Sequence, residues 1–133
     1  MPRVTRLTRS HRLLGSALVA LFGLTLAGSA LAYQRGDWVL AKYRNGPYWF
    51  PGVVEGDTGK GVAVVYDDGE REVLRSNLVK NYNWRPGTMV ECNFKASGKW
   101  FRGRITKLSG EALAIAYVDG DREDTKTGLC RSE

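Results

Sequence analysis

The 133-residue chain has very few histidines, and this shortage excludes several kinds of chemistry. Its one histidine, His11, lies within the first 32 residues. The chain beyond that point has no imidazole for Ser-His-Asp or Cys-His catalysis, nor for the common zinc sites that use histidine. A small hydrolase would then need paired carboxylates, but Asp67, Asp68, Glu70 and Glu72 are crowded along one turn. We therefore predict that the protein is not an enzyme and holds no metal or cofactor.

The chain also lacks a strong positive charge beyond residue 32. It has 20 Lys and Arg against 14 Asp and Glu, but four arginines lie among the first twelve residues with no acid between them: Arg3, Arg6, Arg9 and Arg12. The remaining 16 basic residues face 14 acidic ones. Because this excess is too small for a protein that follows a phosphate backbone, we do not expect a nucleic-acid partner.

Residues 1–32 have the three parts of a secretory signal peptide. A basic head precedes an apolar stretch, which ends in the small residues Ala30 and Ala32 and would leave Tyr33 as the new N-terminus. No cysteine follows to take a lipid, and there is no twin-arginine pair. We predict an N-terminal apolar helix cleaved as a bacterial Sec-type signal, and a protein exported to the periplasm or secreted. The alternative is an uncleaved membrane anchor, because about 20 apolar residues can span a bilayer.

The chain has only two cysteines, Cys92 and Cys130, and they lie far apart in the sequence. Their spacing is unlike that of Cys-x-x-Cys redox or zinc motifs. In an oxidising compartment a disulfide is the default expectation for an even pair. The sequence therefore predicts a structural disulfide between them.

Beyond residue 32 the chain contains an internal repeat. A shift of 51 residues, from Gly36 to Gly87, aligns the chain with itself without a gap and superposes many identical residues: Val39 on Val90, Trp49-Phe50 on Trp100-Phe101, Gly52 on Gly103, Tyr66 on Tyr117, Asp68-Gly69 on Asp119-Gly120, Glu72 on Glu123 and Leu78 on Leu129. We therefore predict a signal peptide over 1–32 and two domains, 33–82 and 83–133. Their short linker ends in Pro86, which favours two units packed together.

Each repeat is predicted to consist of short β-strands. In the first repeat, segments rich in β-branched and aromatic residues are separated by turn-forming residues: 38–43, 48–54, 62–66, 71–74 and a last strand near 78–79. The pair Asp68-Gly69 predicts a type I′ hairpin, in which both residues have positive φ. No helical periodicity follows residue 32. We therefore predict an all-β fold of two tandem five-stranded SH3-like barrels.

The repeat also predicts where the disulfide lies. Cys92 aligns with Ala41 in the first predicted strand, and Cys130 aligns with Val79 in the last. Both first-repeat residues are apolar, as residues in contact inside a barrel would be. If the first and last strands are neighbours, the second repeat replaces this contact with a covalent bridge, which stabilises by about 3–4 kcal/mol for a ring of this size.

Alternation of side chains along the strands predicts an aromatic cluster at one end of each repeat. In an antiparallel meander, Tyr43, Phe50 and Tyr66 converge beside Asp68. The second repeat supplies the equivalent set: Phe94, Phe101, Tyr117 and Asp119. Three aromatic faces with a carboxylate suit a desolvated organic cation.

A structural role is the alternative for these aromatic residues, because large rings also cover a small core. Trp49 and Trp100 are out of phase with Phe50 and Phe101. We expect the two tryptophans either to pack the two barrels together or to form a peptide-binding surface, and packing is the preferred interpretation.

Three motifs carry a family resemblance: Gly-x-x-Val-x-Ala-x-Tyr over 36–43, Trp-Phe-Pro-Gly-Val-Val over 49–54, and Val-Val-Tyr-Asp-Asp-Gly-x-x-Glu over 64–72. They resemble the Tudor family and are similar to its Agenet branch, and the resemblance covers 36–80 and 87–131. It implies bent five-stranded barrels, many of which bind methylated lysine or arginine in an aromatic cage.

Carried over to this sequence, the resemblance places the cage on Tyr43, Phe50, Tyr66 and Asp68 and on their second-repeat counterparts. Members with a full cage often have another aromatic residue after the hairpin glycine, whereas this chain has Glu70 and Asp121. The resemblance therefore implies a three-walled, more acidic pocket.

We therefore expect an exported, non-catalytic binding protein without a stable membrane anchor after cleavage. Its partner would be a protein or peptide that presents a cation such as methylated lysine or arginine. The alternative is a structural domain of the cell envelope, which docks on other proteins or the cell wall without a small-ligand cage.

Overall fold

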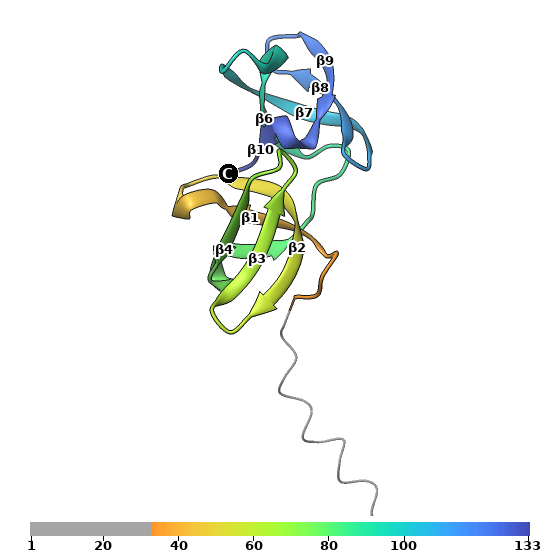
Figure 1. Cartoon of the computed structure of the whole chain (residues 1–133). Helices are drawn as coiled ribbons and strands as arrows, with labels where there is room; N and C mark the ends of the chain where they lie inside the picture. Colours follow the sequence, from red (N-terminus) through yellow and green to blue (C-terminus); the bar gives the residue numbers. More distant parts are fainter. Residues whose placement is uncertain (1–32) are drawn as a thin grey trace, which may run out of the picture. The chain divides into compact units, whose positions relative to one another are not determined.

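The computed structural model describes residues 33–133, which form one compact unit (Figure 1). The predicted signal peptide and its apolar helix lie outside the described residues. Within residues 33–133, no helix has the length and apolar character needed to cross a membrane.

The first repeat forms a five-stranded antiparallel sheet with the strand order β4-β3-β2-β1-β5. Two short 3-10 turns connect its strands. The elements are β1 (Trp38–Lys42), η3 (Tyr43–Asn45), β2 (Trp49–Thr58), β3 (Gly61–Tyr66), β4 (Arg71–Leu74), η4 (Ser76–Leu78) and β5 (Val79–Asn81).

The second repeat forms an equivalent antiparallel sheet with the order β10-β6-β7-β8-β9. Its elements are β6 (Met89–Asn93), η5 (Phe94–Ala96), β7 (Trp100–Ser109), β8 (Ala112–Tyr117), β9 (Arg122–Lys126), η6 (Thr127–Leu129) and β10 (Cys130–Arg131). The all-β prediction and the five strands per repeat are therefore confirmed. Each sheet falls within one predicted domain, 33–82 or 83–133, while the division into two domains stays a prediction.

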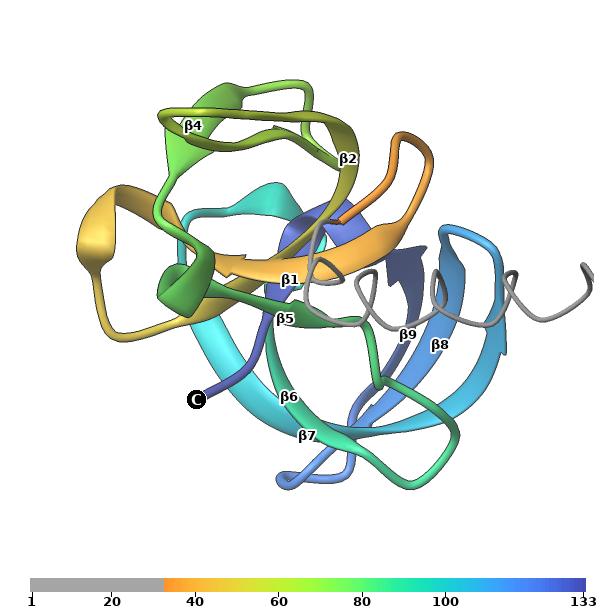
Figure 2. The same cartoon turned by 90° about the horizontal axis from the view of Figure 1, so that it is seen from below.

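The second strand of each repeat is longer than predicted. β2 extends beyond its predicted end at Val54 as far as Thr58, and the pairing of β2 with β3 shifts between Val54 and Gly56. β7 shows the same shift between Ile105 and Lys107. A β-bulge increases the local twist and bends the strand. The extra strand length therefore comes with a sharp change of direction, and Figure 2 shows how strongly both sheets curve.

The predicted type I′ turn at Asp68-Gly69 is wrong. Only Gly69 of that pair has a positive φ, of 96°. The Tyr66 carbonyl accepts a hydrogen bond from the Gly69 N–H at 2.8 Å, and the Tyr66 N–H donates to the Glu70 carbonyl at 2.8 Å. This pattern is a three-residue loop that ends in a left-handed glycine, the next most common hairpin connection. The second repeat has the same pattern from Tyr117 to Asp121.

The core consists of two clusters of buried side chains, and nearly all members of each cluster belong to one repeat. The cluster of the first repeat contains Val39, Ala41, Val54, Val62, Val64, Tyr66, Leu74 and Val79. The cluster of the second contains Trp84, Val90, Cys92, Ile105, Leu113, Ile115, Tyr117 and Cys130. Leu40 is the exception, because this residue of β1 is 0% exposed and packs into the cluster of the second repeat. A side chain on the outer face of the first sheet is thus part of the other core.

The disulfide prediction is confirmed. Cys92 and Cys130 are bonded and face each other across β6 and β10. Ala41 and Val79 face each other at the equivalent position across β1 and β5. Because both cysteines are completely buried, the bridge belongs to the core. A buried disulfide indicates folding in an oxidising compartment.

The two sheets are joined by backbone pairing at the C-terminus. The Trp49 N–H donates to the Ser132 carbonyl at 2.7 Å, and the Ser132 N–H donates to the Trp49 carbonyl at 2.9 Å. Figure 1 shows the C-terminus where the sheets meet. The Trp49 side chain packs against the second core cluster. These contacts favour the packing role that we preferred for Trp49.

Candidate aromatic binding site

The three predicted aromatic residues of the first repeat lie together. Tyr43 comes from η3, Phe50 from β2 and Tyr66 from β3. Their ring centroids are 5.5 Å apart for Tyr43 and Tyr66, 6.1 Å for Tyr43 and Phe50, and 6.5 Å for Phe50 and Tyr66. All three pairs meet edge to face, the arrangement that the ring quadrupoles prefer.

Gly52 makes this convergence possible. It pairs with Tyr66 across β2 and β3, two residues after Phe50. A Cβ atom at position 52 would lie 2.7 Å from the Val65 carbonyl oxygen and 2.8 Å from Val64 Cγ1. Only glycine therefore allows the two strands to approach this closely, and the approach brings Phe50 beside Tyr66.

Glu72 holds the cluster in place, a role that we did not predict from the sequence. The Tyr66 hydroxyl donates to Glu72 Oε1 at 2.7 Å. The Arg44 N–H donates to both carboxylate oxygens of Glu72, at 3.1 and 3.2 Å. Arg44 has a left-handed φ of 51°, so this contact fixes the turn that carries Tyr43. Burial, and then the hydrogen bond to Glu72, raise the pKa of Tyr66.

The same arrangement recurs at Glu123. The Tyr117 hydroxyl donates to Glu123 Oε1 at 2.6 Å, and the Lys95 N–H donates to Glu123 Oε2 at 2.9 Å. We counted Glu72 only among the carboxylates crowded along one turn, but its side chain is half-buried and accepts hydrogen bonds from Tyr66 and Arg44. The match of Glu72 to Glu123 across the repeats was the signal in the sequence that could have revealed this role.

A pocket of about 130 Å³ lies beside the first aromatic cluster. All four predicted residues line it: Tyr43, Phe50, Tyr66 and Asp68. The other lining residues are Pro51, Asp67, Glu70 and Gly128, so three carboxylates surround the space. The approach of the Glu70 carboxylate to the hydroxyl, followed by burial, raises the pKa of Tyr43. A negative, partly aromatic pocket of this kind attracts cations.

The second repeat brings its aromatic residues together as well. The ring centroids of Phe94, Phe101 and Tyr117 are 5.5–6.4 Å apart, nearly as in the first repeat. Asp119 lies on the hairpin that follows Tyr117, and its carboxylate accepts a hydrogen bond from the Asp121 N–H at 2.9 Å. Phe101 differs from its counterpart Phe50, because 42% of Phe101 is exposed whereas Phe50 is half-buried.

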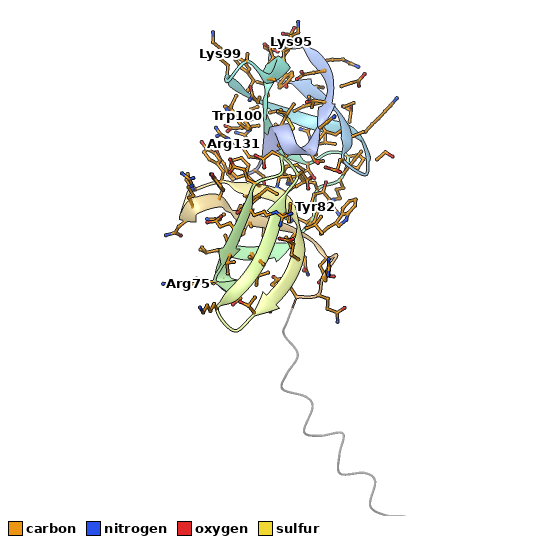
Figure 3. All side chains as sticks on the ribbon, viewed as in Figure 1. Arg75, Tyr82, Lys95, Lys99, Trp100 and Arg131 are labelled. Carbon is orange, nitrogen blue, oxygen red and sulfur yellow. A yellow bond between two sulfur atoms is a disulfide. The ribbon has the colours of Figure 1, made fainter. Side chains whose placement is uncertain are left out.

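Both tryptophans that we singled out are already engaged within the chain. The Arg131 guanidinium lies 3.7 Å from the ring centroid of Tyr48 and 4.1 Å from that of Trp100, and its Nε donates to Glu91 at 3.0 Å (Figure 3). Lys42 and Lys80 lie 4.9 and 4.4 Å from the ring centroid of Trp49. These contacts again favour packing over an open peptide-binding surface.

A smaller cavity of about 70 Å³ lies between the repeats. Its lining includes Tyr82, Asp67, Glu111 and Thr127. The Tyr82 hydroxyl is buried without a hydrogen-bond partner in the described part of the chain. Burial, and then the charge of Asp67, raise the pKa of Tyr82 to about 12. Asp67 therefore lies between this cavity and the aromatic pocket, because it lines both.

Among residues 33–133, no group of three or more His, Cys, Asp or Glu side chains is placed to hold a metal ion. No model of a known protein family matches the sequence, and no curated protein matches it. The functional argument therefore depends on the geometry of the site.

Proposed function

We propose that this protein is an exported, non-catalytic binding protein that holds an organic cation in an aromatic pocket. One observation carries the proposal: four side chains chosen from the sequence, Tyr43, Phe50, Tyr66 and Asp68, line a single pocket together with further carboxylates. The cation that we propose is a methylated lysine or arginine, or a similar group, presented by a protein or peptide.

The attraction between such a cation and the pocket follows from electrostatics. A cation over an aromatic face gains roughly 0.5–1 kcal/mol when exposed and about 2 kcal/mol when desolvated. One ring of the cluster already has a cationic side chain of this protein beside it, since the Arg44 guanidinium lies 5.1 Å from the ring centroid of Tyr43. The carboxylates of Asp67, Asp68 and Glu70 add attraction that an uncharged ligand would not feel.

We further propose that each sheet is a small SH3-like barrel of the Tudor type, preceded by a cleaved signal peptide. The bulge in β2, the pairing of β1 with both β2 and β5, and the buried core of the first repeat are consistent with a strongly bent sheet. The buried disulfide supports an exported location, periplasmic or secreted.

The experiment is a titration of the folded protein with peptides that carry unmodified, dimethylated or trimethylated lysine, or dimethylated arginine. We expect saturable changes in tyrosine and tryptophan fluorescence with the methylated peptides. Phe50→Ala and Tyr43→Ala should each weaken the affinity about tenfold or more while circular dichroism remains that of the wild type. Val73→Ala is the control, because Val73 is an exposed side chain outside the pocket. No response of the wild type to any of these peptides would refute the proposal.

A structural domain of the cell envelope without a small-ligand cage is the second candidate, and the burial of Tyr66 favours a structural role for this ring. Only 4% of Tyr66 is exposed, and its hydroxyl is bonded to Glu72. Tyr66 therefore serves the core as well as the pocket. If the structural role is the function, Phe50→Ala lowers stability but leaves co-sedimentation with isolated cell-wall material unchanged.

A further inference from the structure

We propose that the cation site belongs to the first repeat alone, because the second repeat supplies one of its walls and has no equivalent wall among residues 33–133. This inference rests on the proposed function and assigns it to one of two similar aromatic clusters. The wall is the turn η6, which places Gly128 in the lining of the first-repeat pocket.

Two contacts fix η6 against the hairpin of the first repeat. The Thr127 hydroxyl donates to Asp67 Oδ2 at 2.5 Å, and Thr127 is only 1% exposed. A Cβ atom at Gly128 would lie 3.0 Å from the carbonyl carbon and oxygen of Asp67 and 3.2 Å from the Asp68 nitrogen. The turn therefore lies in close contact with the backbone that carries the carboxylates of the pocket.

The first repeat does not supply an equivalent wall for the aromatic cluster of the second. Its equivalent turn is η4, in which Ser76 matches Thr127 and Asn77 matches Gly128. Ser76 and Asn77 are both exposed, and Asn77 lines a groove on the first sheet, beside Arg44 and Val73. The second aromatic cluster consequently keeps an open side, and Phe101 is 42% exposed there.

The charges around the two clusters also favour the first repeat as the cation site. At the position of Asp67, the second repeat has Val118, which is 72% exposed. The second hairpin therefore offers Asp119 and Asp121, whereas the first offers Asp67, Asp68 and Glu70. With fewer carboxylates and a more exposed ring, the second cluster desolvates a cation less and attracts it less.

The test uses the disulfide-bonded protein without residues 1–32 and trimethyllysine amide as the probe, followed by ¹H–¹⁵N NMR. We expect one-to-one binding, with shifts at the amides of 66–70 and of Gly128 and none at 117–121. Phe50→Ala should weaken the affinity about tenfold or more, equivalent to about 1.4 kcal/mol. The matched variant Phe101→Ala should leave the affinity unchanged.

A second pair of variants tests the wall itself. Gly128→Asn gives η6 the residue of η4 and inserts a side chain against Asp67 and Asp68, so we expect weaker binding. Asn77→Gly makes the reverse change on η4 and should have no effect. Thr127→Val, which keeps the side-chain shape but removes the hydrogen bond to Asp67, should also weaken binding. It provides the same test if Gly128→Asn does not fold.

The outcomes separate this inference from the proposed function. Shifts at both hairpins, or equal losses in Phe50→Ala and Phe101→Ala, overturn the assignment to the first repeat and leave the proposed function intact. Full affinity in Thr127→Val, and in Gly128→Asn where that variant folds, overturns the role of the wall. If neither hairpin responds to the probe, the proposed function fails and this inference fails with it.

Discussion

The two repeats have almost the same aromatic cluster, but the outer face of the first sheet is apolar and that of the second is charged. In the first repeat the outer faces of β1 and β2 carry Leu40, Pro51 and Val53, which are buried or half-buried. In the second repeat the equivalent residues are Glu91, Arg102 and Arg104, and the two arginines are exposed. Positions with the same residue in both repeats therefore define the fold of each sheet. Positions with different residues decide which face of a sheet packs against the other repeat.

The repeats also differ in how their terminal strands are held. The second repeat has a disulfide between β6 and β10, where the first has only the Ala41 and Val79 contact. The first repeat instead packs against the second through Leu40, Trp49 and Asp67. Two copies of one unit thus reach stability by different means.

Replacement of Leu40 by its second-repeat counterpart, glutamate, should have the largest effect on stability. Leu40→Glu inserts a carboxylate into the core of the second repeat without a partner, so we expect a loss of about 3–5 kcal/mol of unfolding free energy. The reverse change, Glu91→Leu, removes a partly exposed pair with Arg131, and we expect a loss under about 1 kcal/mol. Urea unfolding monitored by tryptophan fluorescence measures both, and equal losses would contradict the asymmetry.

Replacement of the disulfide by the residues of the first repeat should have the next largest effect. In Cys92→Ala/Cys130→Val, we expect the unfolding free energy to fall by about 3–4 kcal/mol, because the unfolded chain regains the freedom of the closed loop. Denaturation without reductant tests this. Wild-type protein unfolded in the presence of reductant should show a similar loss, and a variant as stable as the oxidised wild type would contradict the account.

Removal of the shared glutamate should have a moderate effect in each repeat. Glu72→Ala leaves the Tyr66 hydroxyl and the Arg44 N–H without their acceptor, so we expect a loss of about 1–3 kcal/mol. Glu123→Ala should destabilise similarly. Only Glu72→Ala should also weaken cation binding, since it frees the turn that carries Tyr43. Equal effects of the two variants on binding would show that both clusters take part.

The smallest effect concerns the pH dependence at Asp67. Burial, opposed by the Thr127 hydrogen bond and reinforced by the charges of Glu111 and Asp68, raises the pKa of Asp67. The folded state therefore holds this proton more tightly than the unfolded state, and stability falls as pH rises from the ordinary Asp pKa through the raised one. Asp67→Asn should remove this fall. Melting temperatures from pH 3 to 7 test the prediction, and an identical pH profile in the variant would contradict it.

The sequence predicted the features that depend on local pattern and on the repeat. Alternation along the strands placed Tyr43, Phe50 and Tyr66 together, and the match of Ala41 and Val79 to the two cysteines predicted where the disulfide lies. The sequence did not predict the burial of Leu40 or the wall at Gly128, because both arise from contacts between the repeats. The type I′ turn was wrong because Asp-Gly also suits a three-residue loop, in which only the glycine needs a positive φ.

The most direct test of the central claim is a nuclear Overhauser experiment on the protein with saturating trimethyllysine amide. We expect cross-peaks from the probe's methyl protons to the ring protons of Tyr43 and Phe50, and none to those of Phe94 and Phe101. Methyl contacts confined to other residues, or no contacts with the protein, would contradict the claim that the aromatic pocket of the first repeat is a cation-binding site.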